Sequence, residues 1–503
     1  MKRRDFLKAA ACGLAALGTQ GCVSLPRSAR RRPNILFCLS DDQTFLHAGA
    51  YGCRFVNTPA FDRVAREGVR FTHAFVSAPS CGPSRASVLT GLPFYRLREA
   101  AMNHTVWSAG LQTYPDLLAA AGYHVGFTGK GWGPGNWKAA GLKHNPVGVD
   151  YNGRKAQDAK VAGANDYLAN FEDFLAARPA GAPFCFWYGG QDPHRPYQTG
   201  LGRRVGKKLE DAQVPPFLPD APEVRGDLLD YAAGVERFDD YLGRLLHKLE
   251  DIGELDNTLV VVTSDNGMPF PRAKATLYDY GTRMPLAVRW GRQVKAGRLV
   301  DDFVSFTDLA PTFLEAAGLD GPPDLPGRSL LPVLRSGKSG QVDAARDAVV
   351  MGLERHLPGS RKDGSTYPIR ALRTGEHLYV RNYAPDREPL GEAGGPVWPA
   401  DDPTGGWGDC DGSPTKTYLW SHRAQYPELF NLAFGRRPAE ELYDVRQDPC
   451  QMHNLAADGR YQDLKRQLSA RLEQELSRTA DPRAAGQGQF FDDVARRYGG
   501  LAL

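Results

Sequence analysis

The segment "NILFCLSDD", residues 34–42, runs from an apolar stretch directly into two aspartates. A short apolar run that ends in polar residues is typical of a strand buried on both faces of a sheet. Three further segments repeat this pattern: "HVGFTGKGW" (124–132), "FCFWYGGQDPH" (184–194) and "LVVVTSDNG" (259–267). Because ligands bind at the carboxyl ends of strands in parallel sheets, we expect the polar ends of these four segments to form one site.

Helical stretches separate these strands, the clearest over 229–252, where apolar residues recur at three- and four-residue spacing. This alternation predicts an α/β fold with a large, mostly parallel central sheet. Toward the C-terminus the pattern changes to short alternating pieces, a Gly/Pro/Asp-rich insertion (384–414) and a helix (461–478) that is expected to close the chain. We therefore expect a main domain over 27–365 and a C-terminal α+β subdomain over 366–503, whose short antiparallel sheet shapes the mouth of the site.

The N-terminal segment, residues 1–26, is expected to be a targeting segment. "KRRDFLKAAACGLAALG" resembles a twin-arginine export signal, with a basic start and a short apolar run. A basic amphipathic helix is the alternative. "TQGC" places Cys22 as a lipobox cysteine would be placed, but Thr19 stands where a larger aliphatic residue is usual, so lipidation stays open. We expect export through the twin-arginine machinery to the periplasm or cell surface, with any membrane attachment through that lipid anchor.

The formal net charge of +4 over 503 residues is small. It argues against a nucleic-acid partner, whose binding needs clustered basic residues. The six cysteines beyond the N-terminal segment have no paired spacing, and Cys38 and Cys185 lie in apolar runs, where buried thiols are expected. Cys81 differs from the others. In "SCGPSRASVLTG" (80–91) it precedes a Gly-Pro turn and a short helix with an arginine in its first turn.

Two acidic pairs follow predicted strands: Asp41 with Asp42, and Asp265 with Asn266. Either pair alone is more typical of a helix N-cap or a turn. Together at one sheet edge, three carboxylates would repel each other without a cation. Oxygen ligands of this kind favour a hard ion, Ca²⁺ or less often Mg²⁺. The sequence therefore predicts a metal site at these strand ends.

The segment from Cys81 to Arg85 resembles the C-x-P-S-R core of the type I sulfatase signature. "PNILFCLSDD" and "SDNG" are similar to the metal-binding segments of that family, and "FTDLAPTFLEAAGL" (306–319) and "ELYDVRQDPCQMHNLA" (441–456) to its later landmarks. The likeness is greatest to the heparan N-sulfatase (sulfoglucosamine sulfohydrolase) branch and its bacterial relatives. It implies an alkaline-phosphatase-like fold, with 27–365 as the catalytic domain.

The resemblance also implies roles for single residues. Cys81 is expected to be oxidised to Cα-formylglycine by a maturation enzyme, and the hydrated aldehyde then offers one oxygen to attack sulfur and another to expel sulfate. One calcium ion is expected at residue 81, held by Asp41, Asp42, Asp265, Asn266 and the modified Cys81 itself. The expected groups around the sulfate are Arg85 and the helix N-terminus, Lys130 at the nucleophile, His194 as donor to the leaving group, and Lys274 at the ester oxygen.

One position departs from the family pattern. Many members have a histidine two residues after the Lys130 position, proposed to take a proton when sulfate leaves, and here that residue is Trp132. Either another group such as His104 serves as the base, or proton loss to water suffices. A satisfied structural histidine is the other reading of His104.

The resemblance implies a sulfated saccharide substrate and a pocket that removes sulfate from a terminal sugar of a heparan-type or algal polysaccharide such as ulvan. The residues considered as sugar contacts are His104, Arg195, His356, Arg370, Arg387, Trp398 and Trp407. Two other functions stay open from sequence: a phosphodiester or phosphonate monoester hydrolase on the same scaffold, and an exported glycan-binding protein with a decayed site. A serine hydrolase is disfavoured, since no G-x-S-x-G segment follows a predicted strand.

Overall fold

The computed structural model describes residues 32–156 and 165–498. The expected export segment, residues 1–26, lies outside the described residues and stays a prediction. The chain from Pro33 onward forms one compact unit. None of its described helices is both long and apolar enough to cross a bilayer.

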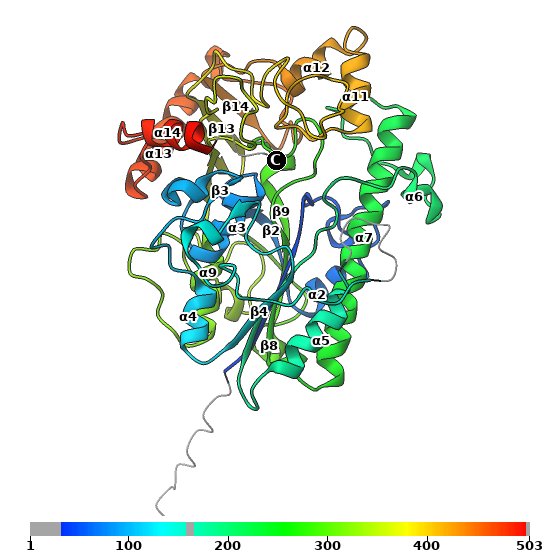
Figure 1. Ribbon diagram of the computed structural model, residues 1–503. Helices are drawn as coiled ribbons and strands as arrows, with labels where there is room; N and C mark the ends of the chain where they lie inside the picture. The colour runs from blue at the N-terminus through cyan, green and yellow to red at the C-terminus, as the bar shows by residue number, and fades with distance from the viewer. Residues whose placement is uncertain (1–31, 157–164, 499–503) are drawn as a thin grey trace, which may run out of the picture. The chain divides into compact units, whose positions relative to one another are not determined.

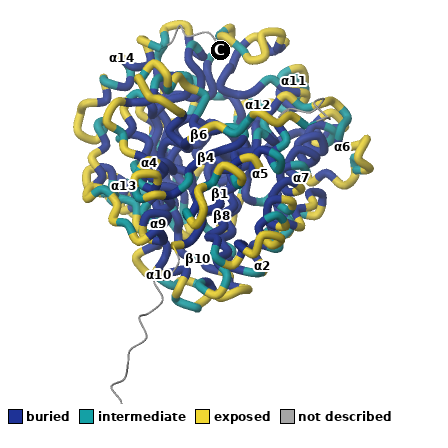
Figure 2. Tube along the Cα trace, turned by 60° about the horizontal axis from the view of Figure 1, so that its bottom comes forward, coloured by how far each residue is buried: buried dark blue, intermediate teal, exposed yellow. Residues whose placement is uncertain are grey.

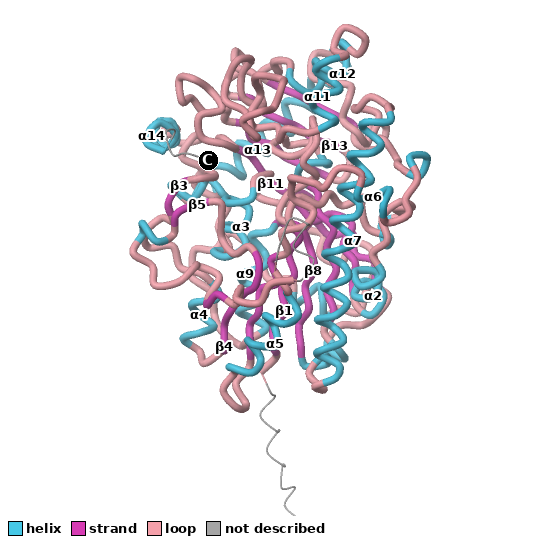
Figure 3. Tube along the Cα trace, turned by 45° about the vertical axis from the view of Figure 1, so that its right-hand side comes forward, coloured by secondary structure: helices cyan, strands magenta, loops and turns pink. Residues whose placement is uncertain are grey.

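An eight-stranded sheet runs through this unit, with helices along it (Figure 3). Its strand order is β10-β2-β9-β8-β1-β7-β4-β6. β9 is antiparallel to both of its neighbours, and the other pairs are parallel. The strand bounds are β1 Asn34–Ser40, β2 Val69–Phe75, β4 His124–Gly129, β6 Val149–Asp150, β7 Phe184–Gly189, β8 Thr258–Ser264, β9 Arg283–Arg289 and β10 Arg298–Ser305.

The four strands predicted from sequence are β1, β4, β7 and β8, and they lie next to one another in parallel. Their carboxyl ends are in register: Ser40 of β1 pairs with Ser264 of β8, and Gly129 of β4 pairs with Gly189 of β7. The polar residues that follow each strand therefore emerge at one edge of the sheet. The mostly parallel α/β prediction is confirmed.

Side chains alternate between the two faces of the sheet, so each face has its own apolar core. Ile35 and Phe37 of β1 pack in one cluster, and Leu36 and Cys38 pack in another. Figure 2 shows that the central strands, such as β1 and β8, are buried. The first face carries α3 (Cys81–Thr90), α4 (Tyr114–Ala120) and α9 (Leu309–Ala316), and the second carries α2 (Pro59–Glu67), α5 (Tyr167–Ala177) and α7 (Pro222–Asp251), as Figure 1 shows. Cys38 and Cys185 are buried thiols, as predicted.

The helix predicted over 229–252 is longer than expected. α7 begins at Pro222, seven residues earlier, because proline is well suited to the first turn and Val224 and Leu228 extend the apolar face. It ends before Gly253, whose φ of 67° is left-handed, a conformation that glycine adopts without steric cost. The shorter helices of this part are α6 (Leu201–Arg204), α8 (Asp279–Thr282) and α10 (Leu331–Arg335), and a small pair of strands is formed by β3 (Thr105–Val106) and β5 (Gly135–Asn136).

The predicted antiparallel sheet is present, with strand order β11-β12-β13-β14. Its strands are β11 (Ala348–Leu353), β12 (Ile369–Thr374), β13 (His377–Asn382) and β14 (Glu440–Asp444). It begins at Ala348, before the expected boundary at 366, and Met351 and Tyr379 share one apolar cluster with Phe37 of the large sheet. The Gly/Pro/Asp-rich insertion (384–414) contains no helix or strand up to Ser413, and α11 (Pro414–Ser421) begins at its last residue. α12 (Pro427–Phe434) follows.

The expected C-terminal helix is α13 (Gln462–Arg478), which packs against the small sheet. The expectation that this helix closes the chain is wrong, because α14 (Gln489–Tyr498) follows it. Phe491 of α14 belongs to the same apolar cluster as Leu472 of α13. The C-terminal part of the chain therefore rests on the same core as the large sheet.

Arg370 was considered as a sugar contact, and the structure contradicts this. Its guanidinium is fully buried, with Nε 2.6 Å from Asp481 Oδ2 and Nη2 2.7 Å from Glu354 Oε1. Its side chain joins β12 to the segment after α13. It does not line the cavity described below. Its function in the structure is to neutralise two buried carboxylates.

We expect Arg370→Met to lower the free energy of unfolding by about 3 kcal/mol, because a buried carboxylate loses its counter-ion. Urea unfolding of the full chain measures this. Arg446→Met is the matched control: its ion pair with Glu376 is exposed on both sides and contributes little. Equal unfolding midpoints for the two variants would show that the buried pair does not hold the C-terminal segment.

Candidate active site

Three carboxylates meet where β1 and β8 end. Asp41 and Asp42 follow β1, and Asp265 follows β8. One oxygen of each carboxylate and the Sγ atom of Cys81 all lie within 4.8 Å of one another. The backbone N–H of Asp42 donates to Asp265 Oδ1 at 3.1 Å, and Asn266 Nδ2 donates to Asp42 Oδ1 at 2.6 Å. The structure therefore brings the predicted ligand residues together.

The residues present fit a hard cation. The Oδ1 atom of Asn266 is buried and accepts no hydrogen bond from the described residues, although a buried amide oxygen normally has a partner. It lies on the residue whose Nδ2 atom binds Asp42. An orphaned amide oxygen beside three carboxylates supplies the all-oxygen donor set that calcium prefers.

The charges around the carboxylates are unevenly distributed. Burial alone would raise the pKa of Asp41, but Lys130, His194 and Arg85 outweigh it and hold that pKa well below its usual range. Burial and repulsion from Asp41 raise the pKa of Asp265 to about 7. The lysine contact at Asp41 is close, with Lys130 Nζ 2.6 Å from Asp41 Oδ2.

Cys81 is the first residue of α3, and its thiol is buried against the carboxylates. The Sγ atom lies 3.5 Å from Asp41 Oδ1 and 4.0 Å from Asp42 Oδ1. Burial raises the pKa of the thiol well above its usual value. The predicted short helix is present, but it begins at Cys81 itself, so Gly82 and Pro83 lie in its first turn and do not form a separate turn before it. Arg85 is its fifth residue, and every residue of the helix is buried.

The N-terminus of α3 differs from the expectation that its amides hold sulfate. The N–H of Gly82 donates to Asn103 Oδ1 at 2.6 Å, Pro83 has no N–H, and the N–H of Ser84 donates to the carbonyl of Ser80. A Cβ atom at residue 82 would lie 2.7 Å from Asn103 Oδ1, so glycine permits this close approach. Most of the amides that were expected to meet an anion are therefore already satisfied.

Arg85 lies beneath the cluster. Its Nε is 2.8 Å from Asp265 Oδ2, and its Nη1 donates to the carbonyls of Lys130 and Gly131 at 2.7 and 3.1 Å. It is fully buried and does not line the cavity. These contacts hold the ends of β4 and β8 together. The Nη2 atom makes no hydrogen bond with the described residues and lies 3.5 Å from Asp41 Oδ1, so the expected contact of Arg85 with sulfate stays a prediction.

Lys274 connects the carboxylate cluster to the C-terminal insertion. Its Nζ atom is 2.8 Å from Asp42 Oδ2, 3.1 Å from Asp411 Oδ2 and 3.4 Å from His194 Nε2. Burial would lower the pKa of Lys274, but Asp411 and Asp42 raise it well above its usual value, so the side chain is charged. Asp411 was missed in the sequence because it lies in an irregular segment with no strand or motif to mark it.

A cavity of about 480 Å³ opens onto this cluster. Five of its polar lining residues lie at the inner end, beside the carboxylate cluster: Asp41, Cys81, Lys130, His194 and Lys274. The other polar lining residues are Asn103, His104, Gln191, Arg195, His356 and Asp411. Trp398 lies at its wall with 46% of its surface exposed. The predictions that His104, His356 and Trp398 lie at the pocket are thus consistent with their places in the structure.

Of three other sugar-contact candidates, one lines the cavity but is ion-paired, and two lie outside the lining. Arg195 lines the cavity, but its Nη1 and Nη2 each lie 2.7 Å from an oxygen of Asp227 and its Nε donates to a backbone carbonyl. Arg387 donates to the carbonyl of Thr366 and lies outside the cavity lining. Trp407 is buried against two phenylalanines of α12. Arg195 and Trp407 have structural partners in place of a sugar.

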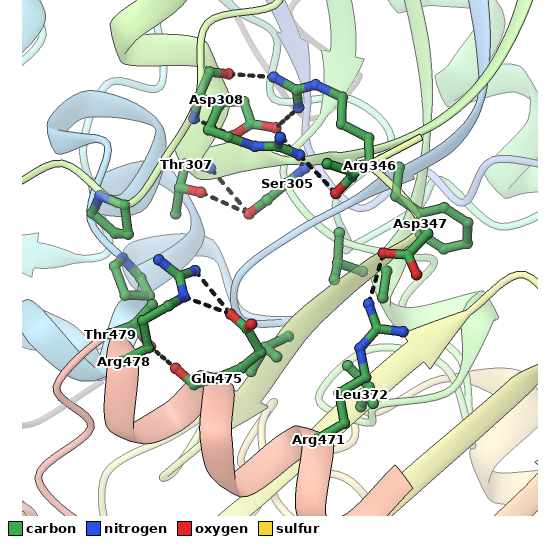
Figure 4. A pocket seen from close by; sticks show the side chains of 18 of the residues that line it. Ser305, Thr307, Asp308, Arg346, Asp347, Leu372, Arg471, Glu475, Arg478 and Thr479 are labelled. Carbon is green, nitrogen blue, oxygen red and sulfur yellow. Dashed lines mark hydrogen bonds and ion pairs between the residues drawn. The ribbon is translucent and has the colours of Figure 1, made fainter. Parts of the chain in front are cut away.

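A second cavity, of about 510 Å³, lies between the end of β10, β11 and α13 (Figure 4). Three pairs of its charged side chains bind each other: Arg346 with Asp308, Arg471 with Asp347, and Arg478 with Glu475. Arg328 pairs with Asp343 outside the lining. Neither of the two described clusters that could hold a metal lies in it. The cavity at Cys81 is therefore the candidate active site.

Trp132 is the residue at the position where the sequence resemblance leads us to expect a histidine, two residues after Lys130. It is buried, its Nε1 donates to the carbonyl of Gly82 at 3.2 Å, and its ring packs edge-on against Trp107. It therefore braces the start of α3. The alternative base, His104, is neutral: burial first, and then the charges of Arg355 and two lysines, lower its pKa to about 4.

We expect His104→Asn to raise KM while kcat changes by less than about threefold, because a base of such low pKa is poorly matched to neutral pH. Asparagine is the appropriate substitution because residue 104 has a φ of 55°, which asparagine tolerates. Steady-state kinetics of sulfate release measures both constants. A fall in kcat of about a hundredfold with unchanged KM would identify His104 as the base.

Comparison with known proteins agrees with this geometry. The family model named Sulfatase matches residues 33–319. The chain is 31% identical to human N-sulphoglucosamine sulphohydrolase over 90% of this chain and 92% of the relative, and 29% identical to an ulvan-active sulfatase of Formosa agariphila over 87% and 78%. The solved structure of BT4656 in complex with D-glucosamine-2-N,6-O-disulfate has a TM-score of 0.65 and 23% identity, covering 90% of this chain and 98% of the other.

The family match covers more than half of the chain, from β1 to the end of α9, and therefore includes Cys81, all four predicted ligands and both lysines. The human relative extends the similarity through the small sheet. The solved structure has the same fold. The chain belongs to the sulfatase family and is a sulfate ester hydrolase.

Proposed function

We propose that this sulfatase removes sulfate from a terminal sugar of a sulfated polysaccharide, of heparan or algal type, with Cys81 converted to formylglycine and one calcium ion bound. The observation that carries the proposal is the position of Cys81, between three carboxylates and the inner end of a cavity of about 480 Å³. Both relatives named above act on sulfated saccharides, according to their names. A cavity of that volume suits one sugar unit and its sulfate better than the middle of a chain.

Each polar group at the inner end then has a function that follows from its position. Asp41, Asp42, Asp265 and Asn266 would hold the calcium ion. When present, formylglycine supplies the attacking oxygen, and calcium neutralises charge beside it. Lys130 and Lys274, each fixed by a carboxylate, face the cavity and stabilise charge on the sulfate oxygens. His194 Nε2, 3.4 Å from Lys274 Nζ, is placed to give a proton to the leaving oxygen or nitrogen.

We further propose that residues 1–26 direct export to the periplasm or cell surface, from the twin-arginine pattern of that segment. That route carries folded protein, so Cys81 would be modified by its maturation enzyme before export. Lipidation of Cys22 is the one membrane attachment that the segment offers.

Mass spectrometry of protein from its native host tests these proposals directly. We expect the tryptic peptide "FTHAFVSAPSCGPSR" (71–85) to have lost the thiol of Cys81 and to carry an aldehyde. The same spectra show whether the mature chain has lost residues 1–26 and whether Cys22 carries lipid. An unmodified thiol in protein that releases sulfate at full rate would overturn the assignment of the nucleophile.

The variant Cys81→Ala is the control for that experiment. We expect it to fold, since the side chain only loses one buried atom, and to release no measurable sulfate from saccharides. Aryl sulfates and phosphonate monoesters assayed in parallel distinguish the sulfatase from a phosphonate hydrolase on the same scaffold. Preferential turnover of the phosphonate would contradict the proposed substrate class.

Calcium is expected to stabilise the folded protein. Binding to the native state alone adds about 2.7 kcal/mol at a calcium concentration 100 times the Kd, so the thermal midpoint should rise on adding Ca²⁺ and fall on adding a chelator. Asp265→Asn should lose this response because a charged ligand is removed. Asp302→Asn is the control: this aspartate is equally buried, binds two backbone N–H groups and lies outside the cluster. An unchanged calcium response in Asp265→Asn would contradict the site.

A further inference from the structure

The cationic side chains that line the active-site cavity, at its inner end and in its outer wall, are paired with carboxylates. Lys130 is paired with Asp41, and Lys274 is shared between Asp42 and Asp411. Arg195 is neutralised by two equal contacts with Asp227. Among the described residues of the lining, the cations are thus bound to carboxylates before any substrate enters.

Asp411 is the acidic group of that outer wall. Its side chain is 6% exposed and lines the cavity, and Lys274 holds its Oδ2 atom at 3.1 Å. Its Oδ1 atom accepts no hydrogen bond from any described residue. Its Oδ2 atom is therefore engaged by Lys274, whereas Oδ1 is left to accept a hydrogen bond in the cavity.

A hydrogen-bond donor lies in the same wall. The N–H of Gly82 donates to Asn103 Oδ1, which orients that amide so that its Nδ2 donates to His356 Nδ1 at 3.2 Å. Ser80 Oγ lies 2.8 Å from the same nitrogen. His356 Nδ1 is therefore an acceptor, and the proton of the neutral ring lies on Nε2. Because His356 also lines the cavity, the wall contains one fixed donor and one fixed acceptor.

We propose that Asp411 selects the sugar unit that carries the sulfate: it accepts a hydrogen bond from a hydroxyl or amino group and repels a carboxylate or a second sulfate. The substrate class is then a sulfated hexose, deoxyhexose or hexosamine, and sulfated uronates are excluded. Trp398 at the cavity wall offers an apolar face against which such a sugar ring packs. This inference rests on the proposed function and specifies its substrate.

The discrimination is electrostatic. A carboxylate brought against Asp411 meets a like charge in a partly desolvated cavity, which weakens its binding and gives specificity by exclusion. A hydroxyl group loses nothing there, because Asp411 replaces the water that it leaves. The selection concerns the remainder of the sugar, since the sulfate itself lies at the lysine end of the cavity.

The test measures affinity in the Cys81→Ala protein, so that turnover is not needed. The ligands are methyl glucoside and methyl glucuronide with sulfate at the same carbon, compared for carbon 2 and carbon 3, together with glucosamine N-sulfate. We expect the glucoside sulfates and glucosamine N-sulfate to bind at least about thirtyfold more tightly than the glucuronides, from the like-charge repulsion. Isothermal titration calorimetry gives each Kd.

In the Asp411→Asn background we expect this ratio to fall below about fivefold, because the amide keeps an acceptor but loses the charge. Asp402→Asn is the matched control: it lies in the same insertion, is buried, and pairs with Lys416 away from the cavity. It should keep the full ratio. A role confined to holding Lys274 would weaken all ligands equally and leave the ratio unchanged.

Equal or tighter binding of the uronates to the Cys81→Ala protein overturns the inference without any Asp411 variant. A ratio that Asp411→Asn leaves unchanged also overturns it. Sulfate release by the mature wild-type protein is measured separately. If no sulfated sugar is hydrolysed, the proposed function fails, whereas the binding ratio still decides what Asp411 does.

Discussion

Repulsion among three buried carboxylates is the constraint on which the rest of the active site depends. Asp41, Asp42 and Asp265 are brought together because β1 and β8 are adjacent and end in register. Three cationic side chains from different parts of the chain form ion pairs with these carboxylates: Arg85 from α3, Lys130 after β4, and Lys274 after β8. Charges of this kind are stable in a protein interior only when paired or bound to metal. The carboxylates thereby fix where each of these segments lies.

The same constraint separates residues that reach the cavity from residues that hold the strand ends in place. Lys130, Lys274 and His194 reach the cavity, whereas Arg85 uses its donors on Asp265 and on the backbone at the end of β4. The start of α3 is similarly engaged, by Asn103 on one side and Trp132 on the other. Residue 81 thus lies among side chains that are fixed by their own contacts, although the buried Nη2 atom of Arg85 makes no hydrogen bond with a described residue.

The sequence predicts most of the large sheet and the inner end of the site, because both follow from local patterns. An apolar run that ends in aspartates identifies a strand end, and Cys81 lies in a specific motif of five residues. The sequence does not reveal the ion pairs of Arg195 and Arg370, since a charged residue in sequence shows no sign of its partner, and Asp227 and Asp481 lie 32 and 111 residues away. Asp411 was missed for the same reason: its contact with Lys274 spans 137 residues. Long-range ion pairs carry no local signal.

The position of Lys274 between Asp42 and Asp411 has a consequence for how this enzyme can change. The sheet edge and the C-terminal insertion share a single ammonium group, so a change in the insertion that removes Asp411 also alters the charge beside Asp42. If Asp411 recognises the sugar as proposed, recognition of the sugar and cleavage of the sulfate depend on the same ammonium group and cannot be exchanged separately. A new sugar specificity requires an insertion that still presents a carboxylate to Lys274, or a second change that restores the balance at the strand ends.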